Sequence, residues 1–258
     1  MTAAPFDLSD TRAFNEARLR SVESLLDELR AAGIELSTAM DVGCGFGFFT
    51  GPLLSKDLQV TAVDGRPENV DVARSRNPGA QFATFDVEDQ AIVSLGQRDL
   101  VLCLGLLYHL ENPFRAIRNL WQLTGRVMIA ESVCAPGQQP ATVLYEEDRD
   151  TDQGLNYVAL IPTESWLVSA MYHAGFAHVY RPKQMPDHPY FRPSLTKRRR
   201  RTLLVASRVP IAAEGLLPIP RSSTRRHIWD RSLLRPVSES QKLRSAVQRA
   251  IHRVPAAE

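Results

Sequence analysis

The sequence predicts an α/β protein whose central feature is a doubly wound, mostly parallel sheet with helices on both faces. Two observations lead to this prediction: apolar runs alternate regularly with helical segments from residue 38 to residue 131, and each run is continuously apolar. Strands covered on both faces have such runs, and their alternation with helices is typical of parallel sheets. The expected strands are 38–42, 58–64, 81–86, 99–104 and 126–131.

Helices are expected before the first strand and between the others. The first runs from about Asp10 to Ala32, because Ser9 or Asp10 can cap it and apolar residues recur at helical spacing. Gly33 then ends the helix, as glycine commonly does after a last helical turn. The helices expected between the strands lie near 47–55, 67–76, 88–95 and 112–123.

The regular alternation ends after the fifth strand. An acidic insertion spans 133–161, and we expect a lid there, because loops over a cleft exclude water and set specificity. We expect an N-terminal helical segment (1–36), a main domain (37–208) and a basic C-terminal tail (209–258) rich in proline and arginine. Beyond the insertion, a helix is expected at 163–174, strands at 176–181 and 202–207, and an amphipathic stretch at 238–253.

The composition excludes several classes of protein. With 258 residues, 44% of them hydrophobic, the chain can bury a core of substantial size. Its three cysteines form no CxxC pair and have no histidine at metal-ligand spacing. This argues against a disulfide framework and a structural zinc site and predicts a cytoplasmic location. The N-terminus has neither a basic nor an apolar stretch, so we expect no signal peptide. The longest apolar run, Val101–Leu107, is too short to cross a bilayer.

The net charge of +2 hides an uneven distribution along the chain. Residues 1–191 hold 15 lysines and arginines against 25 aspartates and glutamates, whereas residues 192–258 hold 16 against 4. The basic tail can dock on the acidic body of its own chain or of a second copy, which would make a homo-oligomer. A disordered tail, an anionic membrane surface and nucleic acid are the alternatives.

A glycine-rich loop joins the first strand to the next helix. It contains Gly43, Gly45 and Gly47, and glycines there let the backbone turn tightly and approach a ligand at the carboxyl edge of the sheet. A dinucleotide-binding fingerprint would have its third glycine at the position of Phe48. Asp41 precedes the loop, and such an acid suits a ligand with a cationic amino-acid portion better than a pyrophosphate.

Acids also close the next two strands. Asp64 ends the second strand, where a carboxylate can accept both hydroxyls of a ribose, and Asp86 ends the third, where it can accept an adenine amine. A single aspartate at a strand end is often only a cap or turn residue. Three acids at three successive strand ends, together with the glycine loop, predict a nucleoside-binding edge.

With these motifs, the sequence resembles the class I S-adenosylmethionine-dependent methyltransferases over residues 38–207. The resemblance implies a Rossmann-like seven-stranded sheet, with six parallel strands and one antiparallel strand, and S-adenosylmethionine as cofactor. It further implies that Asp41 and the loop glycines hold the methionine portion, and that Asp64 holds the ribose. Asp86 and the amide of Val87 would hold the adenine, while Leu104 and Gly105 would line the pocket near the sulfonium. The resemblance to these methyltransferases is found in the segments AMDVGCGFG (39–47), VTAVDGRPEN (60–69), ATFDVED (83–89) and DLVLCLGLLYHLENP (99–113).

Three further segments narrow the resemblance. GLLYHLENP (105–113), GLNYVALIPT (154–163) and AGF (174–176) look like the branch that contains the bacterial tRNA wobble-uridine carboxymethyltransferase. That branch has a Tyr-His pair after the fourth strand, as Tyr108 and His109 are here. Its tRNA enzymes carry a long N-terminal region for a carboxylated cofactor, whereas about 37 residues precede the first strand here, so plain S-adenosylmethionine is expected.

His109 is the candidate general base, because it follows the fourth strand and imidazole exchanges protons near neutral pH. A structural role for His109 is the alternative, and Tyr108 can either contact the methionine carboxylate or substrate, or pack. Glu131 and Tyr157 are expected to face the cleft, with Glu131 orienting a substrate hydroxyl. Cys44 is expected to pack, because transfer from a sulfonium needs no covalent intermediate. The acidic run 146–152 is expected to be solvated rather than to hold a metal ion.

We therefore expect methyl transfer from S-adenosylmethionine to a small-molecule acceptor, at oxygen. Two alternatives stay open. An RNA-modifying enzyme would agree with the tRNA-related resemblance and with the basic run Lys197–Arg201. A non-catalytic subunit that binds S-adenosylmethionine would need the same loop and strand-end acids.

Overall fold

The computed structural model describes residues 8–149, 153–192 and 200–222. The chain divides into two compact units, Met1–Arg221 and Ser222–Glu258. Nearly all of the second unit, including the amphipathic stretch expected at 238–253, lies outside the described residues, so the predictions made for it are not tested. The following description concerns the first unit.

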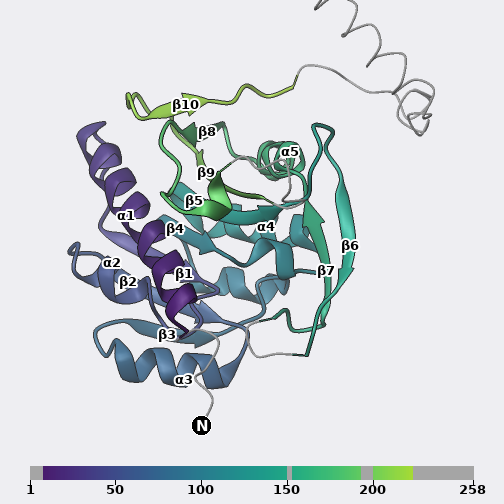
Figure 1. Ribbon diagram of the computed structural model, residues 1–258. Helices are drawn as coiled ribbons and strands as arrows, with labels where there is room; N and C mark the ends of the chain where they lie inside the picture. The colour runs from purple at the N-terminus through teal and green to yellow at the C-terminus, as the bar shows by residue number, and fades with distance from the viewer. Residues whose placement is uncertain (1–7, 150–152, 193–199, 223–258) are drawn as a thin grey trace, which may run out of the picture. The chain divides into compact units, whose positions relative to one another are not determined.

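An eight-stranded sheet crosses this unit in the order β10-β8-β9-β5-β4-β1-β2-β3 (Figure 1). The pairs β1–β2, β1–β4, β2–β3 and β4–β5 are parallel, whereas β9 is antiparallel to both of its neighbours. The strands are β1 (Thr38–Val42), β2 (Gln59–Asp64), β3 (Gln81–Thr84), β4 (Arg98–Leu104), β5 (Thr124–Cys134), β8 (His178–Pro182), β9 (Arg200–Ser207) and β10 (Leu216–Pro218).

The seven strands predicted from the sequence all form, and an unexpected eighth extends the sheet. β10 pairs antiparallel with β8 at the edge of the sheet. It contains only Leu-Leu-Pro, a stretch too short and too close to proline to predict a strand. Six strands therefore share one direction, and β9 and β10 run against them.

The helices between the strands are shorter than the sequence predicts at two places. The helix expected at 47–55 is reduced to α2, because left-handed glycines continue as far as Gly47. The helix expected at 88–95 is the 3-10 helix η2, capped by Asp89. The helices are α1 (Ser9–Ala31), α2 (Thr50–Leu54), α3 (Pro67–Arg76), η2 (Gln90–Leu95), η3 (Leu107–His109), α4 (Pro113–Leu123), α5 (Glu164–Ala174) and η4 (Pro189–Phe191).

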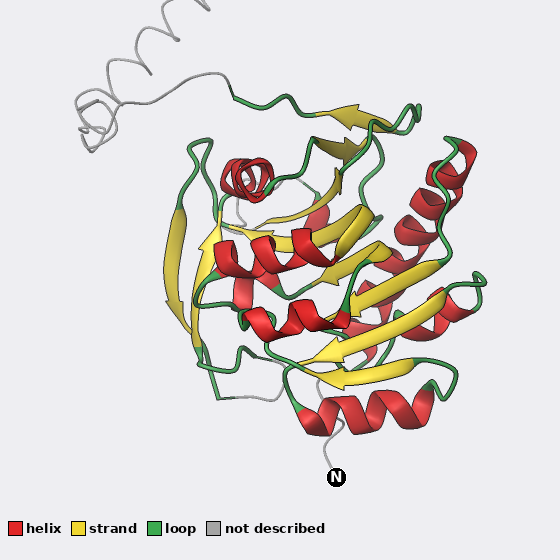
Figure 2. Ribbon diagram, turned by 180° about the vertical axis from the view of Figure 1, so that it is seen from behind, coloured by secondary structure: helices red, strands yellow, loops and turns green. Residues whose placement is uncertain are grey.

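Hydrophobic cores lie on both faces of the sheet, because successive strand residues point to opposite sides. Leu100 and Leu102 pack with α1 and α2 in one core, which lies on the face toward the viewer in Figure 1. Val101 and Cys103 pack with α4 and α5 in the other core. These two helices cover the face of the sheet that is turned toward the viewer in Figure 2. Full burial of each leucine contributes roughly 1.5–3 kcal/mol to folding. Packing on both faces therefore stabilises the sheet, and the sheet positions the loops at its carboxyl edge.

The insertion after β5 contains a β-hairpin that the sequence did not predict. Strands β6 (Thr142–Glu146) and β7 (Val158–Pro162) form a separate two-stranded antiparallel sheet. The amide of Leu160 donates a hydrogen bond to the carbonyl of Leu110, and this bond holds the hairpin next to η3. None of the helices in the described ranges is long and apolar enough to span a membrane.

Candidate active site

A cleft of about 900 Å³ opens at the carboxyl ends of β1, β2 and β4. Small-molecule sites commonly enclose 300–1,000 Å³, so this cleft can hold a cofactor and a small acceptor together. It is bounded by α1, the glycine loop, the strand ends and the hairpin. Among the predicted site residues, those that line it are Gly43, Gly45, Asp64, Asp86, Val87, Leu104, Gly105, Tyr108 and His109.

The glycine loop has two kinds of glycine. Gly43 and Gly45 have positive φ angles of 74° and 51° and line the cleft. A Cβ on Gly43 would lie 3.0 Å from the Leu106 side chain. Gly47, also at positive φ, is not among the described lining residues, and a Cβ there would collide with the side-chain amide of Asn77. Gly43 therefore leaves room for the Leu106 side chain at the wall of the cleft, and Gly47 leaves room for the end of α3.

Asp41 lies beneath the loop and is absent from the described residues that line the cleft. The residue is 2% exposed, and its carboxylate accepts a hydrogen bond of 2.7 Å from Thr50 Oγ1. Burial raises the pKa of Asp41 to about 6, although the Thr50 hydroxyl opposes that shift. The structure therefore places Asp41 under the glycine loop, where it bonds to Thr50 and does not line the cleft. The sequence predicted it at the cofactor.

Asp64 connects three segments around the expected ribose position. Its Oδ2 accepts from the Gly45 amide at 2.9 Å, and its Oδ1 accepts from the Arg66 amide at 3.0 Å and from Asn69 Nδ2 at 3.1 Å. A carboxylate has about four acceptor positions, so capacity remains for a ligand hydroxyl. Asp86 accepts from the Glu88 amide at 2.9 Å and lines the same cleft.

His109 is paired with a carboxylate from the hairpin. Its Nδ1 lies 2.5 Å from Glu147 Oε1, and Glu147 Oε2 accepts from the Gly154 amide at 2.8 Å. Burial favours a higher pKa for Glu147, but the hydrogen bond and charge of His109 outweigh it, and the pKa is lowered. An ionised Glu147 keeps a proton on Nδ1 and leaves Nε2 of His109 as the nitrogen that can accept one.

The loop that carries Gly154 also contacts the ribose-side loop. Arg66 donates to the carbonyls of Gln153 and Gly154, each at 3.2 Å. A Cβ on Gly65 would lie 2.8 Å from the Leu155 side chain, so the two loops pack closely. Tyr157, which the sequence predicted to face the cleft, is absent from the described lining residues, and its ring lies 5.9 Å from the Arg66 guanidinium.

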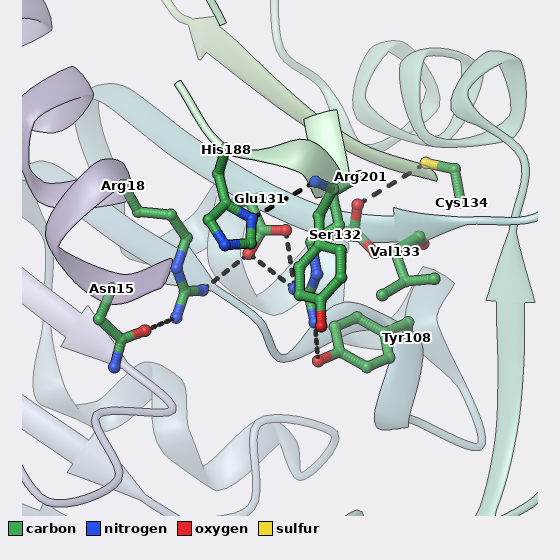
Figure 3. Close-up of polar contacts among 10 residues, drawn as sticks. Asn15, Arg18, Tyr108, Glu131, Ser132, Val133, Cys134, His188 and Arg201 are labelled. Atoms are coloured by element: carbon green, nitrogen blue, oxygen red, sulfur yellow. Dashed lines mark hydrogen bonds and ion pairs between the residues drawn. The ribbon is translucent and has the colours of Figure 1, made fainter. Parts of the chain in front are cut away.

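A second polar cluster occupies the end of the cleft near α1 and β9 (Figure 3). Arg18 and Arg201 line the cleft, and each donates a 2.8 Å hydrogen bond to Glu131. Arg201 also donates to Tyr108 Oη at 2.8 Å. Burial lowers the pKa of Arg201, but Tyr108 and Glu131 more than offset it, so the net shift is upward. Burial is also the largest influence on the pKa of Arg18, and that pKa is lowered.

This cluster changes the expectation for Glu131. The side chain is fully buried and lies behind the two arginines, outside the described lining of the cleft. Sequence reasoning missed both Arg18 and Arg201, although a lone acid in an otherwise apolar strand signals a buried cationic partner. It also treated the run 146–152 as solvated, whereas the Glu147 side chain is 3% exposed and turned inward.

Cys44 is buried within the glycine loop, between Gly43 and Gly45. Burial raises the pKa of its thiol, and the nearby carboxylates of Asp41 and Asp64 raise it further. A thiol in this state is a poor nucleophile, so packing accounts for the residue.

The residues of the cleft suit S-adenosylmethionine. Carboxylates at the ends of β2 and β3 match ribose hydroxyls and an adenine amine, and Phe85 and Val87 supply apolar surface. Nε of Arg18 is buried without a hydrogen-bond partner in the described part of the chain. Nη1 of the same side chain would lie 3.1 Å from a Cβ on Gly105, and a methionyl carboxylate would fit beside this guanidinium. A guanidinium is the usual partner for a carboxylate.

Comparisons with known proteins show which fold this chain shares. Residues 40–126 match the family model described as "Methyltransferase domain". The chain superposes on the N-terminal domain of EvdMO1 with bound SAH (TM-score 0.61, 17% identity, 73% of this chain and 80% of that one). It also superposes on magnesium protoporphyrin IX methyltransferase from Synechocystis PCC 6803 with bound SAM (TM-score 0.55, 20% identity, 81% and 86%). The fold is therefore the Rossmann-like fold of these methyltransferases, and the match to the methyltransferase-domain model covers residues 40–126.

Among curated sequences, the chain is similar to enzymes named ubiquinone biosynthesis O-methyltransferase. That of Xanthomonas axonopodis pv. citri (strain 306) is 36% identical over 110 residues, which are 41% of this chain and 44% of the relative. That of Xanthomonas euvesicatoria pv. vesicatoria (strain 85-10) is 38% identical over the same length. The matched region thus spans less than half the length of these relatives.

Proposed function

We propose that this protein binds S-adenosylmethionine in the cleft and transfers its methyl group to a hydroxyl oxygen of a small-molecule acceptor. The pairing of His109 with Glu147, in the same cleft as Asp64 and Asp86, is the observation that carries the proposal. Similarity to enzymes named O-methyltransferases supports transfer to oxygen. The volume of the cleft favours a small acceptor.

Each group of side chains has a separate task in this reaction. Asp64 and Asp86 bind the nucleoside, and Arg18 binds the methionyl carboxylate. S-Adenosylmethionine supplies, when bound, a methyl group on a sulfonium, which is already an excellent leaving group. Nε2 of His109 accepts the proton of the acceptor hydroxyl, and Glu147 stabilises the imidazolium that results. General bases of this kind typically contribute 10²–10⁴-fold to a rate.

A small acceptor is favoured over RNA by the position of Arg201. This residue is the last of the basic run 197–201, and its guanidinium lines the cleft, where it pairs with Glu131 and Tyr108. A phosphate-binding surface would need basic side chains that are free to face solvent. The tRNA-related branch accordingly stays a secondary proposal.

The experiment is a methyl-transfer assay with labelled S-adenosylmethionine and a panel of catechols, phenols, hydroxy acids and bulk tRNA. We expect labelled methyl ether in at least one small-molecule reaction, and roughly a 10²-fold or larger loss in His109→Gln. Label in tRNA alone would contradict a small acceptor. Transfer at a full rate by His109→Gln would contradict the role of the imidazole.

A further inference from the structure

Arg66 joins the ribose side of the cleft to the segment beside the proposed base. Its backbone is fixed at the cofactor edge, because its amide donates to Asp64 at 3.0 Å and its carbonyl accepts from the amide of Asn69 at 3.1 Å. Its guanidinium extends to the hairpin loop, where Nη2 donates to the carbonyl of Gly154 at 3.2 Å. One residue therefore contacts both the carboxylate proposed to bind the ribose and the loop that lies against His109.

Gly154 connects Arg66 to the base. Its carbonyl accepts from Arg66, and its amide donates to Oε2 of Glu147 at 2.8 Å. The other oxygen of Glu147 lies 2.5 Å from Nδ1 of His109. A Cβ on Gly154 would collide with the carbonyl oxygen of His109, so the loop packs directly against the base. Hydrogen bonds thus run without a break from Arg66 to the imidazole.

The attachment of this loop depends on the Arg66 guanidinium. In the described part of the chain, the hydrogen-bond partners of that group are the carbonyls of Gln153 and Gly154. A hydrogen bond from a charged donor is stronger than one from a neutral donor. The loop has a second, apolar contact, since a Cβ on Gly65 would lie 2.8 Å from the Leu155 side chain. Removal of the guanidinium should therefore loosen the loop while its apolar packing is retained.

The connection extends across the glycine loop. β2, which ends at Asp64, and β4, which precedes η3 and His109, lie on either side of β1. At about 4.8 Å between neighbouring strands, β2 and β4 are about 10 Å apart. Asp64, Arg66, Gly154 and His109 all line the same cleft. A nucleoside bound at Asp64 therefore lies against the segment that holds the base in place.

We propose that Arg66 is a positioning residue, and that it couples cofactor binding at Asp64 to the geometry of the His109–Glu147 pair. This inference rests on the proposed function and concerns the regulation of the same site, because the base is fully positioned only when the cofactor is bound. A ribose that donates to Asp64 restrains the backbone of Arg66, and the Arg66 side chain then restrains Gly154. Couplings between two sites typically change an equilibrium 5- to 150-fold.

The first test measures hydrogen exchange at the Gly154 amide with and without S-adenosylhomocysteine, so it does not depend on turnover. We expect the ligand to slow this exchange about fivefold or more in the wild type than in Arg66→Met, which keeps an apolar stem but cannot donate. Arg66→Lys keeps a charged donor and should retain part of the effect. The matched control is Arg74→Met, because the Arg74 side chain is 53% exposed on α3, and it should behave like the wild type.

The second test separates positioning from a general structural role. With an acceptor found in the panel, kcat should fall about fivefold or more in Arg66→Met, while the affinity for S-adenosylhomocysteine holds. General stabilisation by the ligand is then the same in both proteins. Introduced into Glu147→Gln, the same substitution should cause no further loss, because Arg66 acts on the base through Glu147.

Three results would overturn the proposal. The first is that S-adenosylhomocysteine changes the exchange at Gly154 to the same extent in the wild type and in Arg66→Met. The second is that the losses in kcat from Arg66→Met and Glu147→Gln add. The third is that Arg66→Met binds S-adenosylhomocysteine about tenfold or more weakly, which would make Arg66 a direct cofactor contact. Failure of the wild type to bind S-adenosylhomocysteine would contradict the proposed function itself.

Discussion

Replacement of Glu147 by glutamine is the sharpest probe of the proposed base. The carboxylate accepts from Nδ1 of His109 and from the Gly154 amide, one bond at each oxygen. Glutamine has a single carbonyl oxygen, so it can satisfy only one of these donors. If its amide group faces Nδ1, the imidazole proton moves to Nε2, and the nitrogen that should accept the hydroxyl proton is already occupied.

The expected loss follows from the type of hydrogen bond. A bond that involves a charged group contributes about 1.5–3 kcal/mol, against about 0.5–1.5 kcal/mol for a neutral one. The difference of about 1–1.5 kcal/mol corresponds to roughly a five- to tenfold lower kcat even if the tautomer is retained. A change of tautomer adds to this, and losses near 10⁴-fold are known where an orienting carboxylate becomes an amide.

Two measurements separate positioning from general damage. The kcat with an acceptor found in the panel should fall in Glu147→Gln while the affinity for S-adenosylhomocysteine holds. Nitrogen NMR of the His109 ring should report a changed tautomer. Glu146→Gln is the matched control, because Glu146 is the exposed neighbour and carries the same substitution. If Glu147→Gln behaves like Glu146→Gln in both measurements, the pairing has no role in catalysis.

Three further predictions concern stability and coupling. The pKa of Asp41 is raised from 3.8 to about 6, so the folded state binds the extra proton and stability falls as pH rises through that window. Urea unfolding should show up to about 3 kcal/mol of this fall, and Asp41→Asn should remove it; an unchanged pH profile would contradict the assignment. Gly47 and Gly33 share a φ of +80°, but only a Cβ on Gly47 meets a neighbour. Gly47→Ala should therefore cost at least about 1 kcal/mol more than Gly33→Ala in urea unfolding, and equal costs would refute the steric argument. Arg66→Ala should speed hydrogen exchange at the Gly154 amide in the complex with S-adenosylhomocysteine, because it frees the loop held by Arg66; unaltered exchange would show that the contact is dispensable.

The sheet and the cofactor edge were predictable because their signals are local. The run from Thr38 to Val42 is a strand with those bounds, and Asp64 ends β2 as expected. The next strand ends two residues earlier than predicted, at Thr84, and Asp86 follows it and lines the cleft. The carboxyl ends of parallel strands lie at one edge of the sheet, so residues that follow the strands in sequence come close together in space. Asp41 was expected at the cofactor but does not line the cleft, because its carboxylate is buried under the loop and accepts a hydrogen bond from the Thr50 hydroxyl.

The acceptor end could not be read from sequence, because its contacts join distant segments. Glu147 meets His109 across 38 residues, and Arg201 meets Glu131 across 70. Those pairings depend on the hairpin β6–β7 and on the register of β9 against β5, in which Arg201 is opposite Val133. Pairing register is set by the folded sheet, and periodicity along one strand does not reveal it.

Calorimetric titration with S-adenosylhomocysteine tests the central claim most directly, with wild type, Asp64→Asn and the control Asp71→Asn. The Asp71 side chain is 73% exposed on α3, away from the cleft lining in the described residues. We predict micromolar binding to the wild type and to Asp71→Asn, and a loss of roughly tenfold or more in Asp64→Asn. Wild-type protein that shows no binding, or an Asp64→Asn variant that binds as tightly as Asp71→Asn, would contradict the assignment of this cleft to S-adenosylmethionine.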